Sequence, residues 1–300
     1  MAIVRAAIRN LLVPTANAVF YDNNMFPAQY KEIYTTVRSH MAQEVDVEMR
    51  PFGLAQFQSE ASPLAFDNGF GQKNLTTYVH KKVSIGFGIS EEALTDNLYR
   101  SKFGNMVNML KQSMHVTKDI LAAAPLNSAF TTYRTGDGAL LCDTQHPTDG
   151  GFYANRPAIA SDLTEASIES MLTMVRRLKD LAGKPVHINA VKLVVPPELE
   201  WAACRLTQSS YRTGTNNNDI SAIYNKAALP KGYVVNNYLT SPTAYFILTD
   251  AIDGFKHFVM QDVKVDIDSD FATSNILTKV WERYCFGVTN PRAVIGNPGA

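Results

Sequence analysis

The chain has 300 residues, of which 46% are hydrophobic and 19% charged, with 28 basic residues against 28 acidic ones. This length suffices for a sizeable core and for two domains. A net charge of zero excludes a global attraction to nucleic acid or to an anionic membrane, although a protein that encloses nucleic acid without gripping it would show the same balance.

The first 42 residues are predicted to form an arm followed by a short helix. Arg5 and Arg9 lie in an otherwise apolar stretch that Pro14 ends. The aromatic residues that follow are too numerous for a solvated tail, so they need a surface, either the subunit's own core or that of a neighbour. They are Phe20, Tyr21, Phe26, Tyr30 and Tyr34.

Two alternating stretches, residues 45–50 and 82–89, predict two half-buried strands. The long segment between them is rich in Gly, Pro, Asn and Ser and is also apolar, and loops of this length are usually functional. We therefore expect an extended hairpin whose tip contacts another subunit. The apolar residues of the tip are Phe52, Leu54, Phe57, Leu64, Phe66 and Phe70.

A long helix is predicted next, capped by Ser90 and stopped by Pro125. Seven residues, all but one of them apolar, recur along it at alternating spacings of four and three, which places them on one face. The other face is left for solvent or for a neighbouring subunit. The seven positions are Phe103, Val107, Leu110, Met114, Thr117, Leu121 and Ala124.

A turn-rich connection leads to a domain boundary near residue 160. The stretch from 164 to 182 predicts a helix that Gly183 ends, and KLVV at 192–195 and AYFILTD at 244–250 predict buried strands of an α/β domain. The last 45 residues return to β structure, which we expect to pack against the long helix.

Motifs for catalysis or cofactor binding are missing from the sequence. It contains no P-loop, no G-x-S-x-G and no H-E-x-x-H, and its GxG pairs lack the rest of a dinucleotide fingerprint. The three widely spaced cysteines argue against disulfides and a cysteine zinc site. Cys142 and His146 are more simply structural than metal ligands. Asp262, Asp266, Asp268 and Asp270 could hold a cation, but a solvated strand face explains them more simply.

The order of elements, together with the markers LLCDTQHPTDGGFYANRP, KLVVPPELEWAACRLTQS and AYFILTD, resembles the major capsid proteins of tailed double-stranded DNA bacteriophages. The resemblance is to the HK97 fold, and in particular to the group related to the head subunit of phage Mu. It covers nearly the whole chain and implies an α+β capsid fold with no enzymatic activity and no cofactor or metal.

The resemblance also implies a division of the chain. Residues 1–42 would be an N-arm, 43–90 an extended E-loop hairpin, and 161–254 an α/β axial domain around five-fold and six-fold axes. Residues 91–160 and 255–300 would form a peripheral domain with a spine helix at 91–124. The residues expected at inter-subunit contacts are Phe52, Leu54, Phe57, Phe66, Phe70, Lys81, Lys82, Arg5 and Arg9.

The implied partners are copies of the chain itself, in pentamers and hexamers, assembled in the host bacterial cytoplasm into a virion shell around double-stranded DNA. A separate scaffolding protein, a portal and a decoration protein are further expected partners, and no membrane is. A lysine–asparagine crosslink between Lys73, Lys81 or Lys82 and Asn290 is conceivable, but no motif supports it.

Two other functions stay open at this point. An encapsulin-like shell shares the fold and encloses protein cargo, and packaged DNA or co-purifying portal and tail proteins would argue for a virus instead. A cytosolic α/β enzyme with a long helix would behave as a monodisperse monomer or dimer without large particles.

Overall fold

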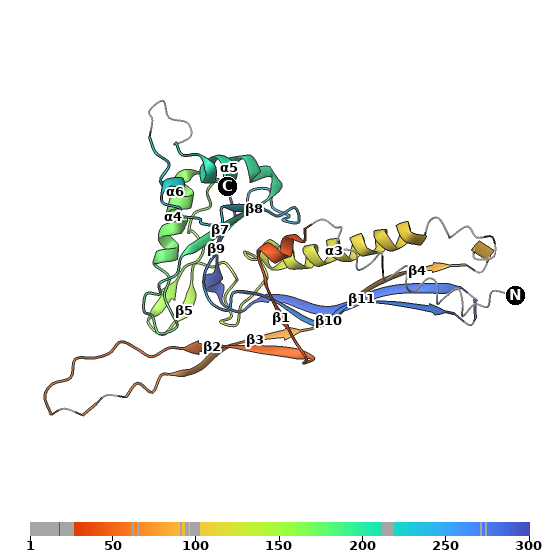
Figure 1. Cartoon of the computed structure of the whole chain (residues 1–300). Helices are drawn as coiled ribbons and strands as arrows, with labels where there is room; N and C mark the ends of the chain where they lie inside the picture. The colour runs from red at the N-terminus through yellow and green to blue at the C-terminus, as the bar shows by residue number, and fades with distance from the viewer. Residues whose placement is uncertain are drawn as a thin grey trace.

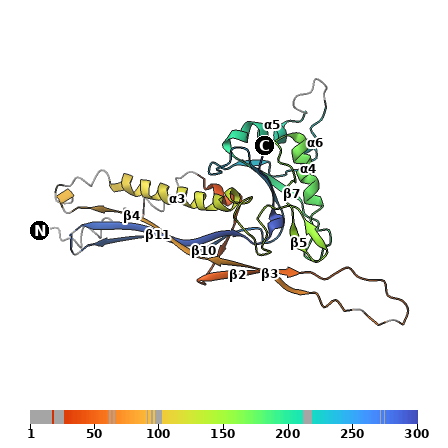
Figure 2. The same cartoon turned by 180° about the vertical axis from the view of Figure 1, so that it is seen from behind.

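The computed structural model has an elongated body with a long helix, a compact α/β unit at one end, and a hairpin that projects beyond it (Figure 1). The same three parts are seen from behind in Figure 2. The structure describes residue 18 and residues 27–300, apart from positions 62, 65, 91, 94–95, 97–102, 212–218, 271 and 274.

The elongated part is a four-stranded sheet in the order β1-β10-β11-β4, with the helix α3 lying along it (Figure 1). Its apolar residues face α3, and together they form one buried cluster that includes Val107, Leu110, Met114 and Val280. The first half of the predicted helical stripe is therefore the face that packs. At the far end the prediction was wrong, because Leu121 and Ala124 are exposed and Ala122 and Leu126 are buried instead. The bounds are β1 Thr35–Arg38, β4 Lys81–Ile89, α3 Phe103–Asn127, β10 Phe255–Ser269 and β11 Ile276–Val288.

The long helix does not stop where the sequence predicted. The helix α3 continues through Pro125 to Asn127, so the expected end at residue 124 was wrong. Pro125 has no N–H to donate to the carbonyl of Leu121, and Leu121 is an exposed residue. Leu126, which is 1% exposed, packs into the core and holds the last turn in place. The predicted beginning at residue 91 lies largely outside the described residues.

The hairpin is built from β2 (Gln43–Arg50) and β3 (Gly71–Val79), which pair antiparallel. The predicted partner, 82–89, instead forms β4 and pairs with β11, so that prediction was wrong. β4 alternates clearly because Val83 and Phe87 pack toward α3, whereas β3 is mostly polar and gave no periodic signal.

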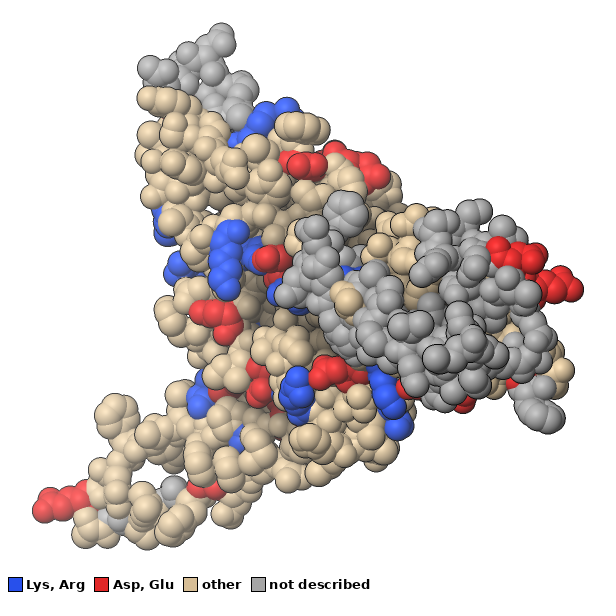
Figure 3. Space-filling view, turned by 45° about the vertical axis from the view of Figure 1, so that its right-hand side comes forward, with Lys and Arg blue, Asp and Glu red and all other residues tan. Residues whose placement is uncertain are grey.

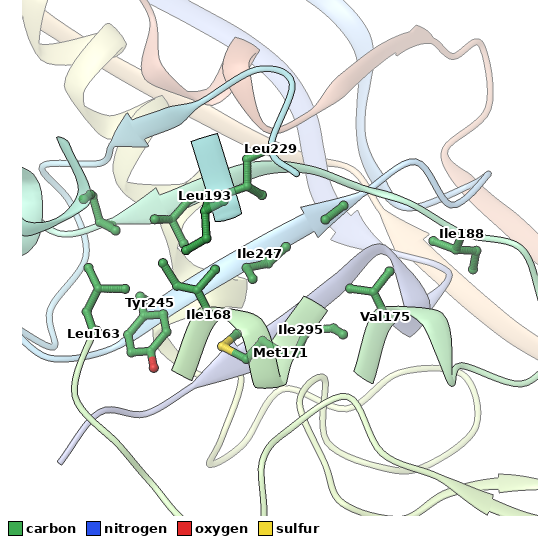
Figure 4. Packing of buried hydrophobic residues seen from close by; sticks show 14 of the residues in the cluster. Leu163, Ile168, Met171, Val175, Ile188, Leu193, Leu229, Tyr245, Ile247 and Ile295 are labelled. Carbon is green, nitrogen blue, oxygen red and sulfur yellow. The ribbon is translucent and has the colours of Figure 1, made fainter. Parts of the chain in front are cut away.

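The compact unit holds a second four-stranded sheet in the order β12-β9-β7-β8. The helix α4 covers one face of this sheet, and Figure 4 shows Ile168, Met171 and Val175 of α4 packed toward Leu193 and Ile247. The described elements here are α4 Glu165–Arg176, β7 Ala190–Val195, η2 Pro197–Leu199, α5 Glu200–Gln208, α6 Ala222–Asn225, β8 Tyr233–Val235, β9 Tyr245–Thr249, η3 Pro291–Ala293 and β12 Val294–Asn297.

Two boundaries in this unit differ from expectation. The helix α4 is capped by Thr164 and ends at Arg176, well before the predicted end at residue 182, because the chain turns to form a bridge between Lys179 and Pro185. The final strand β12 pairs with β9 in the second sheet. The expectation that all the closing strands join the elongated sheet was therefore wrong.

The two sheets share a second core. The face of the second sheet opposite α4 packs on the end of α3 through Val194, Phe246, Ala122 and Leu126. Tyr34, which follows the short helix η1 (Gln29–Glu32), is buried in this cluster and donates a hydrogen bond from its hydroxyl to the Ala122 carbonyl at 2.7 Å. The early aromatic residues were expected to lie either in the subunit's own core or on a neighbour, and Tyr34 lies in the subunit's own core.

Candidate assembly surface

The tip of the hairpin carries most of the exposed large apolar side chains that the sequence singled out. Phe57 is fully exposed, and Phe66 and Leu54 are exposed at 81% and 79%. Phe52 and Phe70 are half-exposed and stack on each other with ring centroids 4.7 Å apart. Such an apolar surface on a projecting element is typical of a protein–protein contact.

The neck of the tip is closed by one carboxylate. Asp67 accepts backbone hydrogen bonds from Gly53 at 2.5 Å and from Gly69 at 2.8 Å, and it pairs with Arg50 at 3.6 Å. The two backbone N–H groups, together with Arg50, hold the pKa of Asp67 below its usual range. The Phe52–Phe70 stack lies beside this closure, so the two strands enter the tip at a defined separation.

The neck is also tied to the compact unit. Asp149, in the turn between β5 (His146–Thr148) and β6 (Gly151–Tyr153), accepts hydrogen bonds from both Arg50 and Lys73. These two cations lower the pKa of the Asp149 carboxyl.

The base of the hairpin is joined to the body by more buried charges. Glu48 pairs with Arg292 at 2.5 Å, with the two side chains 15% and 5% exposed. Asp46 accepts hydrogen bonds from Lys256 at 2.6 Å and from the Thr289 hydroxyl at 2.7 Å. The hairpin is thus held to its own subunit at the base and the neck, while its apolar tip projects past both.

The predicted lysines lie elsewhere. Lys81 and Lys82 are on β4 of the elongated sheet and not on the hairpin, and Lys82 lies over the Trp281 ring at 4.8 Å. Of the other residues considered for a crosslink, Lys73 is paired with Asp149 and Asn290 donates to the Ile252 carbonyl at 3.0 Å.

Arg5 and Arg9 fall outside the described residues.

Sequence reasoning missed Asp149 and Asp67, because single aspartates in turn-rich segments give no periodic signal. The motif around Asp149 nevertheless has a structural explanation. His146 is fully buried, with its Nδ1 2.7 Å from Asp137 and its Nε2 2.9 Å from the side-chain oxygen of Asn155. The side-chain amide of Asn155 in turn donates to the Leu141 and Pro291 carbonyls. The HPTDGG…N marker therefore builds the turn that presents Asp149.

Among the described residues, no group of three or more His, Cys, Asp or Glu side chains is placed to hold a metal ion. None of the helices in the described ranges combines the length and apolarity that crossing a membrane requires.

The chain is similar to one family of known proteins. The chain matches the family model of the phage capsid protein over residues 74–297. None of the curated proteins matches it.

Three solved structures illustrate the fold that the chain shares. The capsid of a native GTA particle is 12% identical, with a TM-score of 0.57 over 91% of this chain and 90% of that one. The mature capsid of bacteriophage PhiM1 is 12% identical, with a TM-score of 0.57 over 92% and 88%. The virus-like particle from Pyrococcus furiosus is 11% identical, with a TM-score of 0.53 over 97% of each chain.

The fold is therefore the α+β capsid fold of HK97 type, and the elongated sheet, long helix and projecting hairpin are its parts. The chain belongs to the phage capsid protein family. It is a structural protein of the virion shell and not an enzyme.

Proposed function

We propose that the chain is the major subunit of an icosahedral phage head, arranged in pentamers and hexamers around double-stranded DNA and assembled in the host bacterial cytoplasm. The observation that carries this proposal is the projecting hairpin, whose tip exposes Leu54, Phe57 and Phe66 to solvent in the isolated subunit. Burying an apolar side chain of this size contributes about 1.5–3 kcal/mol, so several of them per contact suffice to drive association.

The division of the chain follows the fold with corrected edges. In this proposal residues 43–79 are the E-loop, and β4 joins α3, β10 and β11 in the peripheral domain. The unit that contains α4 and the second sheet is the axial domain, with β12 as its last strand.

A deletion tests the role of the hairpin. Because β3 begins at Gly71, we delete only residues 55–66 and join the ends with a short Gly-Ser linker, which leaves the Asp67 closure and the strand pairing intact. We expect a soluble, folded subunit that forms no shells in negative-stain electron micrographs. Normal shells from this deletion would remove the hairpin from the assembly mechanism.

The enclosed DNA is proposed to be confined and not gripped. The net charge is zero. On the face of the subunit drawn in Figure 3, basic and acidic residues are interspersed, without a large area of one sign. Isolated subunits should bind DNA no more tightly than the roughly 10⁻⁴–10⁻⁶ M typical of non-specific binding at physiological salt. A salt titration of the affinity is the measurement, and sub-micromolar binding at high salt would overturn this proposal.

A separate scaffolding protein, a portal and a decoration protein are the further partners that we propose. An encapsulin-like shell, which has the same fold, is the second and weaker candidate. Cargo separates the two, because particles purified from infected or induced cells should contain DNA if the chain builds a phage head and protein cargo if it builds a nanocompartment.

A further inference from the structure

The hairpin is attached to its own subunit almost entirely through polar groups. No residue of β2 or β3 belongs to any of the three hydrophobic clusters formed by the described residues. The exception to the polar attachment is Tyr78, which is buried and lies against the Phe258 ring with centroids 5.0 Å apart. Charge pairs and hydrogen bonds, and not core packing, therefore set the direction in which the hairpin points.

These polar contacts fall into two groups that differ in burial. The base group consists of Asp46 and Glu48 with their partners Lys256 and Arg292, whose side chains are 16% and 5% exposed. Thr289 donates to Asp46 as well and is itself within hydrogen-bonding reach of Tyr78. Breaking one of these pairs leaves each charge with one partner fewer in a region of low solvent access, so the base group resists opening.

The neck group is more open to water. Asp149 is 37% exposed, and its partners Arg50 and Lys73 are 18% and 35% exposed. Lys184 adds a hydrogen bond to the Phe52 carbonyl at 2.5 Å. Partly exposed pairs of this kind shift an equilibrium by no more than about fivefold each, and salt weakens them.

We propose that the hairpin is a swinging arm with a fixed base and a releasable latch. Asp46 and Glu48 hold the base, and Asp149 is the latch that holds the neck through Arg50 and Lys73. Releasing the latch lets the arm turn about its base, so that the apolar tip reaches a neighbouring copy of this chain. The purpose given to the swing rests on the proposed function, whereas the latch itself is a property of the single subunit.

The test measures the arm's direction in the unassembled full-length subunit. Spin labels at Gln56→Cys in the tip and Ser170→Cys on α4, in a Cys204→Ser/Cys285→Ser background, report the tip-to-body distance by double electron–electron resonance. We expect a narrow distance distribution for the wild-type latch in low salt. Asp149→Asn should broaden it, and so should 1 M NaCl on the wild-type latch, because the screening length then falls to about 3 Å.

Two further variants make the result specific. Asp149→Glu keeps the charge and should keep the distribution narrow. Asp262→Asn removes a carboxylate of similar chemistry, paired with Arg38 at 3.0 Å on an exposed part of the sheet, and should change nothing.

A distribution that stays narrow in Asp149→Asn, or one that salt does not broaden, would overturn the latch. The salt measurement needs no substitution at the latch, so it decides the matter even if Asp149→Asn fails to fold. Shell formation is scored separately by electron microscopy. A subunit whose arm is released by salt but which never forms shells would keep the latch and contradict the proposed function.

Discussion

The second sheet and the hairpin differ in what holds them in place. Ile168, Met171, Leu193 and Ile247 of the compact unit are completely buried around one sheet. Among the described residues of the hairpin only Tyr78 is buried, and the apolar side chains of the tip, Phe57 above all, face solvent. Apolar residues thus serve folding in the first region and are left available for association in the second.

This contrast divides the effects of mutation. A substitution in the core of the compact unit acts on the free energy of unfolding, because it removes contacts that the isolated subunit makes. A substitution at the hairpin tip removes contacts that only the assembled shell would make. The predictions below test that division, beginning with the largest expected loss of stability.

The largest loss is expected from Ile247→Ala in β9. Ile247 lies in the middle of the sheet between α4 and the shared core, so the cavity cannot collapse easily. The free energy of unfolding should fall by about 2–5 kcal/mol, measured by urea denaturation of the unassembled subunit. Leu54→Ala, an equally apolar truncation at the tip, is the matched control and should change it by less than about 0.5 kcal/mol. Equal losses in both would erase the contrast.

A loss of about 3 kcal/mol is expected from Arg292→Met at the base of the hairpin. Its guanidinium pairs with Glu48, donates to the Lys179 carbonyl at 2.6 Å and lies over the Tyr153 ring at 4.6 Å, and the variant leaves the Glu48 carboxylate with one partner fewer. Thermal and urea unfolding measure the effect. Arg38→Met, which removes an exposed pair with Asp262, should cost less than about 1 kcal/mol, and a similar cost for both variants would contradict the role of burial.

A smaller, pH-dependent loss is expected from Asp137→Asn. The His146 ring and the Thr135 hydroxyl bond to Asp137, and these contacts hold its pKa below the ordinary value despite burial. A carboxyl with a lowered native pKa stabilises the fold above its unfolded pKa of about 4, and this contribution is lost as pH falls through the native pKa.

The variant should therefore be about 1–3 kcal/mol less stable at pH 7. Its free energy of unfolding should also fall less steeply than that of the wild type below about pH 4. Urea titrations at pH 7, 5 and 3 measure both effects. Identical pH profiles for variant and wild type would show that Asp137 is not the group responsible.

The sequence predicted those parts of the fold in which burial imposes a period. The spacing of Val107, Leu110 and Met114 located the packed face of α3 because a helix that lies on a sheet buries one side only. The exposed apolar tip was also predictable, since Phe57 and Phe66 have no place in a solvated loop. The capsid fold was predicted from the resemblance to a known family, which rested on the order of the elements together with markers such as AYFILTD.

Strand pairing and polar contacts were not predictable in the same way. Which of two consecutive extended segments pairs with β2 depends on contacts far along the chain, and the polar strand β3 carries no alternation that would mark it. Asp149 meets Arg50 only because the turn built around His146 faces the hairpin. Contacts between residues about a hundred positions apart leave no local pattern.

The smallest effect on stability should come with the largest effect on assembly. Replacing Leu54, Phe57, Leu64 and Phe66 together by Ser removes apolar surface that is already 64% or more exposed in the subunit, so folding has little to lose. The free energy of unfolding should stay within about 0.5 kcal/mol of the wild type.

Shells should nevertheless be missing from electron micrographs and from the fast-sedimenting fraction in ultracentrifugation, because the tip no longer gains energy by being buried on a neighbour. Ile159→Ser, which changes a residue 82% exposed outside the hairpin, is the control and should leave shells intact. If the fourfold variant still assembled, the exposed tip would be incidental, and the energy of assembly would have to come from the remaining surface of the subunit.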